Sequence, residues 1–446
     1  MYEAFNSTFI SLIPKTDCPE SFNNFQPIAV YNCIYKIIAK IIANRLRPIL
    51  SAHISPKKFA FLNNCQIHDV IGTTQGVLHS IKVKRLKGMI LKVDLSKYFD
   101  HASWLYLIML LTHLGFPVEF INWIMCCITK VSFIVLINGS ASPLFHAERR
   151  LIQGFPLSPL LFLLIMEGLS RLISEECRLG RIQGIKITNA YTLTHLLFVD
   201  DVLLFLNGSI GDMIDIYSIM LIFSTATGME SNDSKSTIST SGFSPHEIHF
   251  TLHIFPFTLK SMDDGLKYLG FHLKPLHYRI VDWIWLVEKI ECKINIWHHK
   301  SLSRVSCLVL IKFVLEATPV YWMSLAWIPR GILMRIQKLC CGFPWKGRHD
   351  GRIYAWVHWE LIALPNKWGG WGLKILTHFS TTLAAKLGWK VLTAHSLWTE
   401  VVLHKYIYPL RILDWIRLPS WNRTDISVIW KDVLNSISYI YDGLTW

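Results

Sequence analysis

The first part of the chain alternates segments with helical and strand-like hydrophobic patterns. Residues 31–50 place apolar side chains at helical spacing, with lysines and arginines between them, which predicts a helix with a basic face. Residues 89–93 form a short apolar run typical of a buried strand. Two further runs, residues 131–138 and 144–148, flank Gly139 and predict a hairpin. Helices and strands mixed in this way indicate an α+β sheet domain.

Another helix and another pair of strands follow. Residues 158–177 begin with a Ser-Pro pair and precede Gly180, which predicts a capped helix with a proline in its first turn and a glycine stop. The apolar runs 195–198 and 202–206 predict two strands. The three residues between these strands are Val-Asp-Asp, so two carboxylates interrupt an otherwise apolar region.

The composition changes near residue 275. Sixteen of the eighteen tryptophans lie at or after Trp283, and the apolar pattern becomes helical. The expected helices are residues 283–297, 308–317, 332–341 and 380–392. This change predicts a boundary between a sheet domain and a helical region.

The tryptophans of the last hundred residues have two explanations. Tryptophan fills helical cores, and we expect these side chains to be core residues. Alternatively they form a surface for nucleic acid, because bases stack on aromatic rings and lysines bind phosphates. The residues concerned are Trp356, Trp359, Trp368, Trp371 and Trp389, with Lys367, Lys374, Lys386 and Lys390.

The bulk composition changes this picture in two ways. The net charge is +14, from 45 Lys and Arg against 31 Asp and Glu, which favours a polyanionic partner. Hydrophobic residues make up 52% of the chain, so a membrane protein has to be considered. No apolar stretch reaches the roughly 18–20 uninterrupted residues of a spanning helix. We therefore expect large buried cores and no membrane partner.

Three aspartates stand where the predicted strands end. Asp200 and Asp201 lie between two strands, and Asp94 follows the run 89–93. Two carboxylates about 4 Å apart repel by about 4 kcal/mol at an effective dielectric of about 20. A divalent cation reverses this penalty, and hard oxygen ligands suit Mg²⁺ or Mn²⁺. Three carboxylates on adjacent strand ends can hold two ions for phosphoryl transfer.

Two ordinary explanations stay open for these residues on the local pattern alone. Asp200 and Asp201 could simply form a hairpin turn, since aspartate favours turns. Asp94 could cap a following helix.

A series of short motifs runs through the chain at residues 12–15, 35–37, 91–100, 153–159, 198–201, 232–236 and 266–270, and two more segments lie in the tail, 308–312 and 369–373. In this order, the motifs resemble those of LINE-type (non-LTR) retrotransposon reverse transcriptases. The tail segments resemble the region that follows the polymerase in plant elements of this type.

The resemblance implies a right-hand polymerase with fingers, a palm built on an antiparallel sheet, and a helical thumb. Such an enzyme copies RNA into DNA, so the expected partners are an RNA template, a DNA primer and deoxynucleoside triphosphates, with activity in the nucleus. Asp94, Asp200 and Asp201 would bind two Mg²⁺ ions, or Mn²⁺. The expected domains are fingers at 1–86, palm at 87–275, thumb-like helices at 276–345 and a tryptophan-rich helical region at 346–446.

The resemblance also assigns roles on the nucleotide side of the site. Phe99 would be the aromatic gate that excludes a 2′-hydroxyl, and its alternative is an ordinary buried aromatic. Gln153 and Gly154 would approach the incoming nucleotide, because glycine permits close backbone contact. Their alternative is a turn before a helix. Lys235 would neutralise or protonate the pyrophosphate leaving group, or it is a solvated lysine.

On the primer side, Tyr268 and Gly270 would shape the turn that grips the primer. The alternative is the end of a plain strand.

The chain departs from the family pattern at several positions. Gln26, Cys65 and Ile152 stand where the family has arginine, which removes a fixed charge and its fork of donors. Tyr98 replaces a small alanine and Phe155 a cysteine, and the family's R-G-L-R becomes R-R-L-I.

The family pattern also extends beyond this sequence, since no endonuclease domain precedes it and no zinc segment or ribonuclease H domain follows. We therefore expect a truncated or decayed copy whose isolated activity is weak or absent. The alternative function is a catalytically impaired nucleic-acid-binding relic of the same fold.

Overall fold

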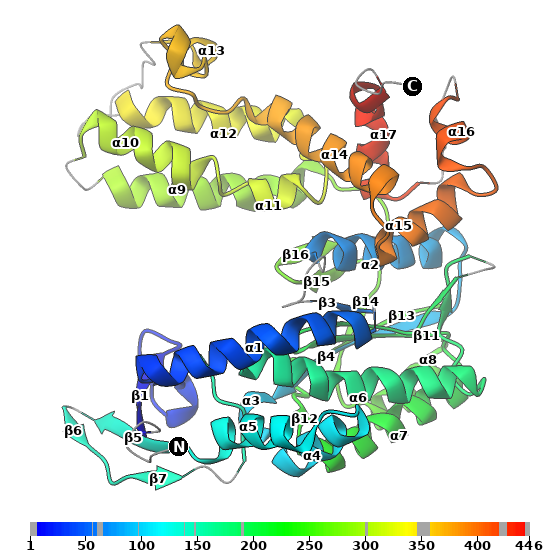
Figure 1. Ribbon diagram of the computed structural model, residues 1–446. Coiled ribbons are helices and arrows are strands. Elements are labelled where there is room, and N and C mark those ends of the chain that lie inside the picture. Colours follow the sequence, from blue (N-terminus) through cyan, green and yellow to red (C-terminus); the bar gives the residue numbers. More distant parts are fainter. Residues whose placement is uncertain are drawn as a thin grey trace. The chain divides into compact units, whose positions relative to one another are not determined.

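The chain folds into two compact units (Figure 1). The first comprises Met1–Ile67 and Leu86–Ser261, and the second His68–Arg85 and Met262–Trp446. The expected α+β class is confirmed, whereas the four functional domains stay a prediction. The computed structural model describes residues 7–55, 57–59, 66–96, 98–137, 139–146, 149–188, 191–298, 302–345, 357–418 and 426–441.

A mixed sheet forms the centre of the first unit. Its strand order is β14-β13-β4-β11-β10-β3, with β12 paired to the end of β4. The central pairs β13–β4, β4–β11 and β11–β10 are antiparallel. The strands are β3 (Lys58–Phe59), β4 (Gly88–Ser96), β10 (His195–Phe198), β11 (Asp201–Leu206), β12 (Glu230–Ser231), β13 (Thr237–Ser241) and β14 (Thr258–Ser261).

Alternation along β4 explains which way its side chains point. Leu91, Val93 and Leu95 are at most 3% exposed and belong to the helix-covered core. Successive strand residues face opposite sides of a sheet, so Lys92 and Asp94 face away from that core. The strand is longer than the predicted 89–93, because β12 continues the pairing at Leu95 and Ser96.

Helices cover one face of this sheet (Figure 1). The predicted helix at 158–177 is confirmed as α6, and Gly180 ends it with a φ of +75°. The cap was wrong, because Leu157 occupies the N-cap position and no side chain caps the helix. The helices of the first unit are α1 (Cys33–His53), α3 (Tyr98–His101), α4 (Trp104–His113), α5 (Val118–Thr129), α6 (Ser158–Arg178), α7 (Ile210–Thr227) and α8 (Pro245–Ile254).

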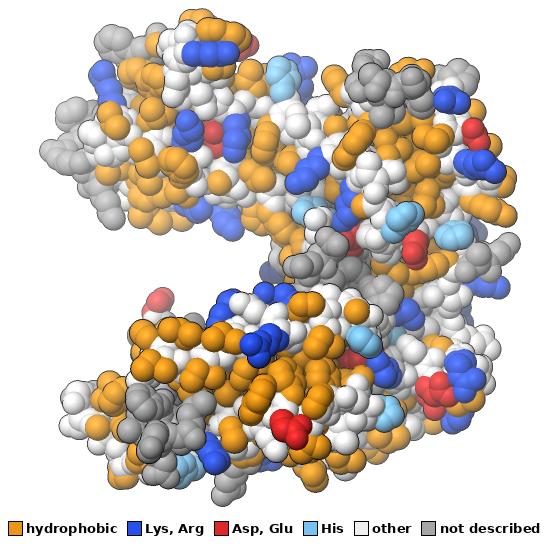
Figure 2. Space-filling model, in the orientation of Figure 1, with side chains coloured by type: hydrophobic (Ala, Val, Ile, Leu, Met, Phe, Trp, Pro, Cys, Tyr) orange, Lys and Arg blue, Asp and Glu red, His pale blue; other side chains and the backbone are white. Residues whose placement is uncertain are grey.

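The exposed side of α1 mixes apolar and basic side chains, as the sequence predicts. Ile37 is 59% exposed and Ile41 48%, and Lys36 and Lys40 are exposed beside them. Figure 2 shows hydrophobic and basic side chains together over this helix.

Among the described residues, α7 has the length and composition of a membrane-spanning helix, with a mean hydropathy of 1.3. In the fold one side of it packs into the first unit's core, where Met213, Ile216 and Phe223 are at most 1% exposed, whereas the other side is exposed, with Leu221 at 56% and Ile222 at 57%. Its first turn is also fixed, because Asp212 accepts hydrogen bonds from the Gln183 and Gly184 amides.

A second sheet lies at the N-terminal side of the first unit. In it β1 (Ser7–Pro14) pairs with β2 (Phe25–Val30) and with β5 (Ser132–Ile137). The predicted hairpin is confirmed, since β5 pairs antiparallel with β7 (Phe145–His146). The connection contains β6 (Ser140–Ala141). A small separate ladder joins β8 (Ile185–Lys186) to β9 (Thr192–Leu193), and a short helix η2 (Phe22–Asn24) precedes β2.

The second unit is mainly helical, and the four helices predicted after residue 275 are confirmed with shifted ends. Its elements are α2 (Ile67–Val83), β15 (Leu266–Tyr268), β16 (Phe271–Leu273), η3 (Ile280–Trp283), α9 (Ile284–His298), α10 (Arg304–Leu310), η4 (Ile311–Leu315), α11 (Val320–Met323), α12 (Arg330–Gly342), η5 (Phe343–Trp345), α13 (Trp359–Ile362), η6 (Asn366–Trp368), α14 (Leu376–Thr393), α15 (Leu397–Val402), η7 (Leu403–Ile407), α16 (Ile412–Ile416) and α17 (Val428–Tyr441).

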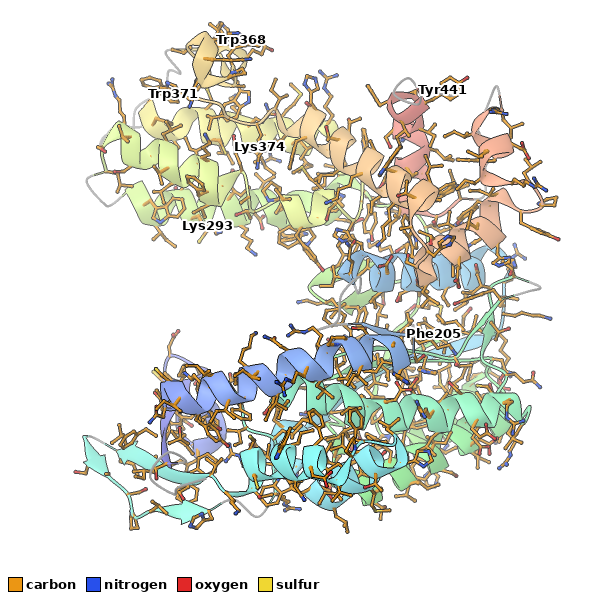
Figure 3. All side chains as sticks on the ribbon, in the orientation of Figure 1. Phe205, Lys293, Trp368, Trp371, Lys374 and Tyr441 are labelled. Carbon is orange, nitrogen blue, oxygen red and sulfur yellow. The ribbon has the colours of Figure 1, made fainter. Side chains whose placement is uncertain are left out.

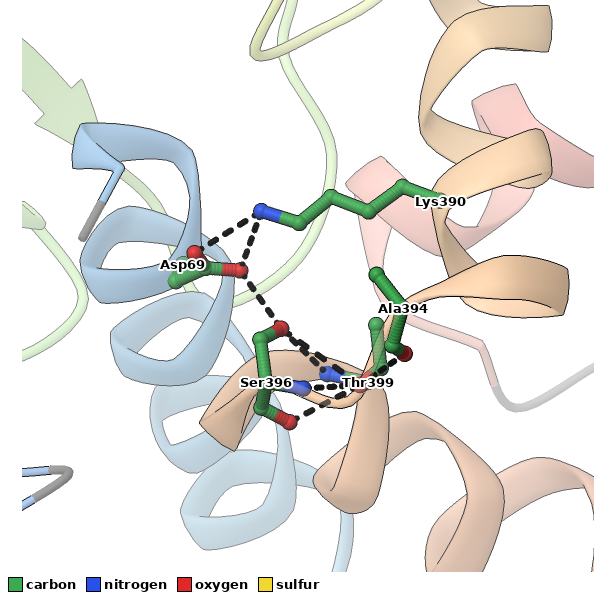
Figure 4. Close-up of polar contacts among 5 residues, drawn as sticks. All are labelled: Asp69, Lys390, Ala394, Ser396 and Thr399. Carbon is green, nitrogen blue, oxygen red and sulfur yellow. Dashed lines mark hydrogen bonds and ion pairs between the residues drawn. The ribbon is translucent and has the colours of Figure 1, made fainter. Parts of the chain in front are cut away.

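A buried polar cluster joins α2 to the C-terminal helices (Figure 4). The Asp69 carboxylate is 1% exposed and accepts two hydrogen bonds from Lys390 Nζ, at 2.7 and 2.8 Å. It also accepts one from Ser396 Oγ, at 2.8 Å. Ser396 caps α15 at the same time. The carboxylate therefore satisfies groups from two elements, and its charge is paired inside the unit.

The tryptophans of the second unit divide into two groups. Trp398, Trp415 and Trp430 are core residues, at most 4% exposed. The expectation of a core role was wrong for the exposed members of the tail set, because Trp368 is 65% and Trp389 50% exposed. Trp359 and Trp371 are half-buried, and Trp356 lies outside the described residues.

Candidate active site

Asp94 and Asp201 lie directly opposite each other on neighbouring strands. In the antiparallel pairing of β4 with β11, their Cα atoms are partners in the register. Directly opposed side chains in such a pair have Cβ atoms about 4.5–5.5 Å apart. Both carboxylates therefore face the same side of the sheet, away from the helix-covered core.

Asp200 belongs to the turn that joins β10 to β11. Phe198 pairs with Asp201, so the loop consists of Val199 and Asp200 alone. Val199 has a φ of +54°, in the left-handed region that β-branched residues rarely enter. Strain of this kind costs about 1–3 kcal/mol and concentrates at functional sites. The hairpin-turn explanation is thus correct for the backbone, and the turn also carries a carboxylate next to the opposed pair.

Electrostatics show that these carboxylates are close and partly desolvated. Burial, with smaller contributions from the Asp201 and Asp94 charges, raises the pKa of Asp200 to about 6. Burial also raises the pKa of Asp201, against the lowering effect of Lys92. A group whose charged form is disfavoured in this way gains from a nearby cation.

Lys92 is a residue of this site that the sequence motifs did not indicate. Its Nζ lies 3.4 Å from Asp201 Oδ1, and both side chains are about a quarter exposed or less. Lys92 stands two residues before Asp94 on β4, so alternation puts the two on one face. Register with β11 is what brings it to Asp201, and register is not visible in the pattern.

The turn 232–236 holds the backbone of Asp94. The Asn232 amide donates to the Asp94 carbonyl at 2.7 Å, and the Asp94 amide donates to Ser236 Oγ at 3.1 Å. Ser236 is fully buried, whereas Lys235 beside it is exposed. Sequence reasoning singled out Lys235 and missed Ser236, whose contact with Asp94 spans two elements far apart in the chain.

Phe99 lies in the short helix α3, five residues after Asp94. Its half-buried ring lies 5.5 Å from the ring of Phe162 on α6. The carbonyl of Phe99 accepts a hydrogen bond from the Leu151 amide at 2.6 Å, which ties α3 to the segment before α6. Phe99 is therefore a fixed, partly accessible aromatic in the same unit as the aspartates.

Gln153 and Gly154 form part of the loop that leads into α6. Gly154 is exposed and has a φ of +87°, a conformation that favours glycine. Gln153 is half-buried. The turn explanation is correct for the backbone here too, and an exposed glycine leaves the loop open to a ligand.

Tyr268 and Gly270 belong to the second unit, so the fold of the first unit alone does not bring them to the aspartates. Tyr268 pairs with Phe271 across a two-residue turn in which Leu269 and Gly270 both have positive φ. This is the backbone of a type I′ hairpin turn. The carbonyl of Leu269 accepts a hydrogen bond from Tyr321 Oη at 2.5 Å.

The three aspartates fit a hard divalent cation by chemistry, since all their donors are carboxylate oxygens and one pair is directly opposed. Across the described ranges, however, no three His, Cys, Asp or Glu side chains are already arranged around a common metal position.

Sequence comparison places this chain in a family. The family model for reverse transcriptases (RNA-dependent DNA polymerases) matches residues 13–273. The chain belongs to this family. Its members are RNA-directed DNA polymerases that use divalent metal ions, so the expected enzyme class is confirmed at the level of the family. The matched range contains every residue of the candidate site.

Proteins of transposable elements are among the relatives of this chain. An uncharacterized 149 kDa protein of transposon TX1 from Xenopus laevis is 25% identical over 82% of this chain and 27% of its own length. A Pol polyprotein of the type-2 retrotransposable element R2DM from Drosophila melanogaster is 31% identical over 45% of this chain and 18% of its own. The resemblance to LINE-type elements is confirmed, and the plant-like origin stays a prediction.

The chain thus spans about a quarter of the length of the first of these relatives and less of the second. Among solved structures, a telomerase from Candida albicans aligns with 90% of this chain and 62% of its own, at 13% identity and a TM-score of 0.45.

Two of the departures from the family pattern occupy buried positions. Ile152, in place of an arginine, is fully buried in the core of the first unit. Phe155 is 1% exposed and packs with Tyr31 and Tyr35, whose ring centroids both lie 5.2 Å away. These apolar side chains are therefore accommodated by packing. Cys65 and the side chain of Tyr98 lie outside the described residues.

Arg150 carries backbone strain. Its φ of +132° favours glycine, the residue that the family's R-G-L-R has at this position. The guanidinium is held by Asp100, at 3.5 Å, and lies over the Phe133 ring, at 5.0 Å. Gln26, in place of another arginine, is half-buried in β2 opposite Ile13.

Proposed function

We propose that this chain itself catalyses RNA-directed DNA synthesis, extending a DNA primer 3′-hydroxyl on an RNA template with deoxynucleoside triphosphates. The observation that carries the proposal is the register that opposes Asp94 to Asp201, with Asp200 in the adjoining strained turn. Family membership and a net charge of +14 support a nucleic-acid substrate.

In this proposal Asp94, Asp200 and Asp201 hold two Mg²⁺ ions, with Mn²⁺ as a substitute. When bound, the ions would supply Lewis-acid activation of the 3′-hydroxyl and neutralise charge on the triphosphate. The raised pKa values of Asp200 and Asp201 support this assignment, because a cation would relieve the repulsion that burial strengthens. Lys92 neutralises part of this charge before metal binds.

The neighbouring residues have distinct proposed tasks. Phe99, fixed against Phe162, would lie beneath the sugar and exclude a 2′-hydroxyl. Gly154 would let the backbone approach the nucleotide, with Gln153 beside it. Lys235 is exposed, so its ammonium group is accessible to a pyrophosphate leaving group, which it would neutralise or protonate. Tyr268 and Gly270 would shape the primer-side turn.

Primer extension tests this proposal. A labelled DNA primer annealed to an RNA template is incubated with the chain, Mg²⁺ and deoxynucleotides. We expect products in the wild type and none in the double variant Asp200→Asn, Asp201→Asn. Binding of the same primer–template by both proteins is the control for folding.

The outcome also separates the two functions that the sequence left open. Extension that needs the aspartates establishes a polymerase. Binding without extension in the wild type would contradict the proposal and establish the impaired relic instead. The burial of Ile152 supports the polymerase, because a side chain enclosed in the core is not in a position to meet phosphate.

A further inference from the structure

We propose that the second unit carries a separate binding surface for single-stranded RNA. The surface consists of three tryptophans, Trp345, Trp368 and Trp371, with three cations among them, Arg304, Lys312 and Lys367. This proposal rests on the proposed function in one respect, the choice of RNA as the bound strand. A template that is copied is single-stranded RNA before it enters the site.

The centre of the surface is a stack of rings capped by a cation. The Trp345 and Trp371 rings are stacked, with centroids 6.0 Å apart and planes 29° apart. The exposed guanidinium of Arg304 lies 5.2 Å from the Trp345 ring. Both indoles are half-buried, so each keeps an accessible part. A cation over an aromatic ring is attracted to its face and also offers a charge to a phosphate.

A tightly closed turn presents the outer tryptophan. The amides of Trp371 and Gly372 donate to the carbonyls of Ile362 and Leu364, at 2.8 and 2.9 Å. A Cβ on Gly370 would lie 2.0 Å from the Leu364 carbonyl oxygen, so this turn requires glycine. It holds Trp368 at 65% exposure (Figure 3). An indole fixed outward on a rigid turn is a preorganised platform for stacking.

Cations line the same turn. Lys367 Nζ lies 4.9 Å from the Trp368 ring. A Cβ on Gly372 would lie 3.6 Å from Lys312 Nζ, which places that ammonium group beside Gly372, the residue after Trp371. In Figure 2, Lys and Arg side chains lie among hydrophobic ones over α12 and α13.

Acidic groups are scarce around this turn. Residues 361–399 contain four lysines and no Asp or Glu, although the exposed Glu360 directly precedes them. Glu316 accepts a hydrogen bond from the Lys374 amide at 2.8 Å and is only 1% exposed, so it offers no competing surface charge. The surface is therefore aromatic and basic, which complements the bases and phosphates of a single strand.

A cavity continues this chemistry. It has a volume of about 880 Å³, and Phe343, two residues before Trp345, forms part of its wall. Arg330, Arg335 and Lys338 of α12 also line it, together with Trp359 and two carboxylates, Glu291 and Glu360. The three cations exceed the two carboxylates, so a strand leaving the stack of Trp345 and Trp371 would meet a further aromatic ring and a small excess of positive charge.

The test measures RNA affinity with polymerisation excluded. The full chain carrying Asp200→Asn is titrated with a fluorescein-labelled oligouridine, without primer, nucleotides or metal, and anisotropy is recorded. We expect Trp368→Ala to weaken binding about tenfold, the order of one lost base stack. The matched control is Trp389→Ala, which removes an indole of similar exposure, 50%, from α14. Equal affinity of the two variants would overturn the proposal.

Two further measurements vary the charge of the surface and the type of RNA. We expect Lys367→Gln to reduce the salt dependence of binding by about 0.7 in the slope of log K against log salt. An RNA duplex should compete poorly, because its bases cannot stack on the rings, and equal competition would contradict base stacking. If Trp368→Ala abolishes self-association in sedimentation while RNA affinity is unchanged, the surface is a protein interface and the proposal is wrong.

These results are distinguishable from failure of the proposed polymerase. A chain that extends no primer but loses RNA affinity through Trp368→Ala keeps this surface. A chain that extends primers and binds RNA independently of Trp368 keeps the polymerase and loses this surface.

Discussion

At the scale of single residues, the sequence predicts the charged side chains of the site but not the partners that they contact. The motifs identify Asp94, Asp200 and Asp201, since each follows or interrupts an apolar strand. Alternation along β4 also puts Lys92 on the face of Asp94. The ion pair of Lys92 with Asp201 depends on the register between β4 and β11, which the pattern of either strand alone does not determine.

Lys92 gives the first prediction. Because its ammonium group competes with a metal for Asp201, Lys92→Met should lower the Mn²⁺ concentration for half-saturation roughly two- to fivefold, the size of a weak ion pair. Electron paramagnetic resonance of free Mn²⁺ measures this directly. Lys92→Arg keeps a cation and should stay near the wild type. A higher half-saturating concentration in Lys92→Met would mean that Lys92 assists metal binding.

The strained backbone of Val199 gives the second prediction. Its positive φ should cost about 1–3 kcal/mol, whereas asparagine tolerates this conformation. Val199→Asn should therefore raise the free energy of unfolding by about 1 kcal/mol. Urea denaturation checks this, and Val199→Gly should change stability in the same direction. A loss of stability in both variants would show that packing of the valine outweighs backbone strain.

At the scale of elements, the helix α2 is the clearest case of what sequence could not predict. Asp69 is 321 residues from Lys390, and no local pattern connects them. A lone aspartate near the start of a helix suggests an interaction with the helix dipole, not a buried ion pair. By contrast, the helices α1, α9, α12 and α14 follow from hydrophobic periodicity, because each buries one side against a core.

The Asp69 cluster gives the third prediction. Asp69→Ala leaves Lys390 charged and unpaired beside buried groups, so it should reduce the free energy of unfolding by about 3–5 kcal/mol. The matched control is Asp263→Ala, which removes the exposed partner of Lys82 and should cost less than about 1 kcal/mol. Similar losses in the two variants, measured by urea denaturation, would show that burial of Asp69 adds nothing.

The buried Lys405 of η7 gives the fourth prediction. Its Nζ donates to the Gly76 carbonyl and to Ser80 Oγ, at 2.9 and 2.7 Å, and lies 3.2 Å from His79 Nδ1. Burial, with a smaller effect of Lys84, lowers the pKa of Lys405 to about 7, and burial lowers that of His79 to about 4. His79 is therefore neutral above that pH and can accept.

The sign of the pH dependence follows. Between pH about 7 and the unfolded pKa near 10.4, the unfolded state binds more protons than the folded state, so stability rises with pH. Lys405→Met removes this term. We therefore expect the melting temperature of the wild type, relative to that of Lys405→Met, to rise as the pH is raised across this range. A difference independent of pH would contradict the lowered pKa.

At the scale of the whole molecule, the α+β class and the family were accessible from sequence, because ordered motifs and apolar strands carry them. The division of the tryptophan-rich tail into buried and exposed rings was not accessible from the sequence. Tryptophan is both large and apolar and able to stack on a ligand, so composition could not separate Trp430 in the core from Trp368 on the surface. The glycines at 369, 370 and 372 form the turn that exposes Trp368. This role follows from the positive φ values and close contacts of the turn, which the sequence alone does not show.

The central claim is that Asp94, opposed to Asp201, takes part directly in nucleotide addition to a primer on RNA. This is tested by the rate of a single nucleotide incorporation at saturating Mg²⁺ for Asp94→Asn, with Asp17→Asn as a control at an exposed aspartate of the same unit. We expect the incorporation rate of Asp94→Asn to fall at least about a hundredfold, the order expected when charge stabilisation is removed. Equal rates in the two variants would contradict it.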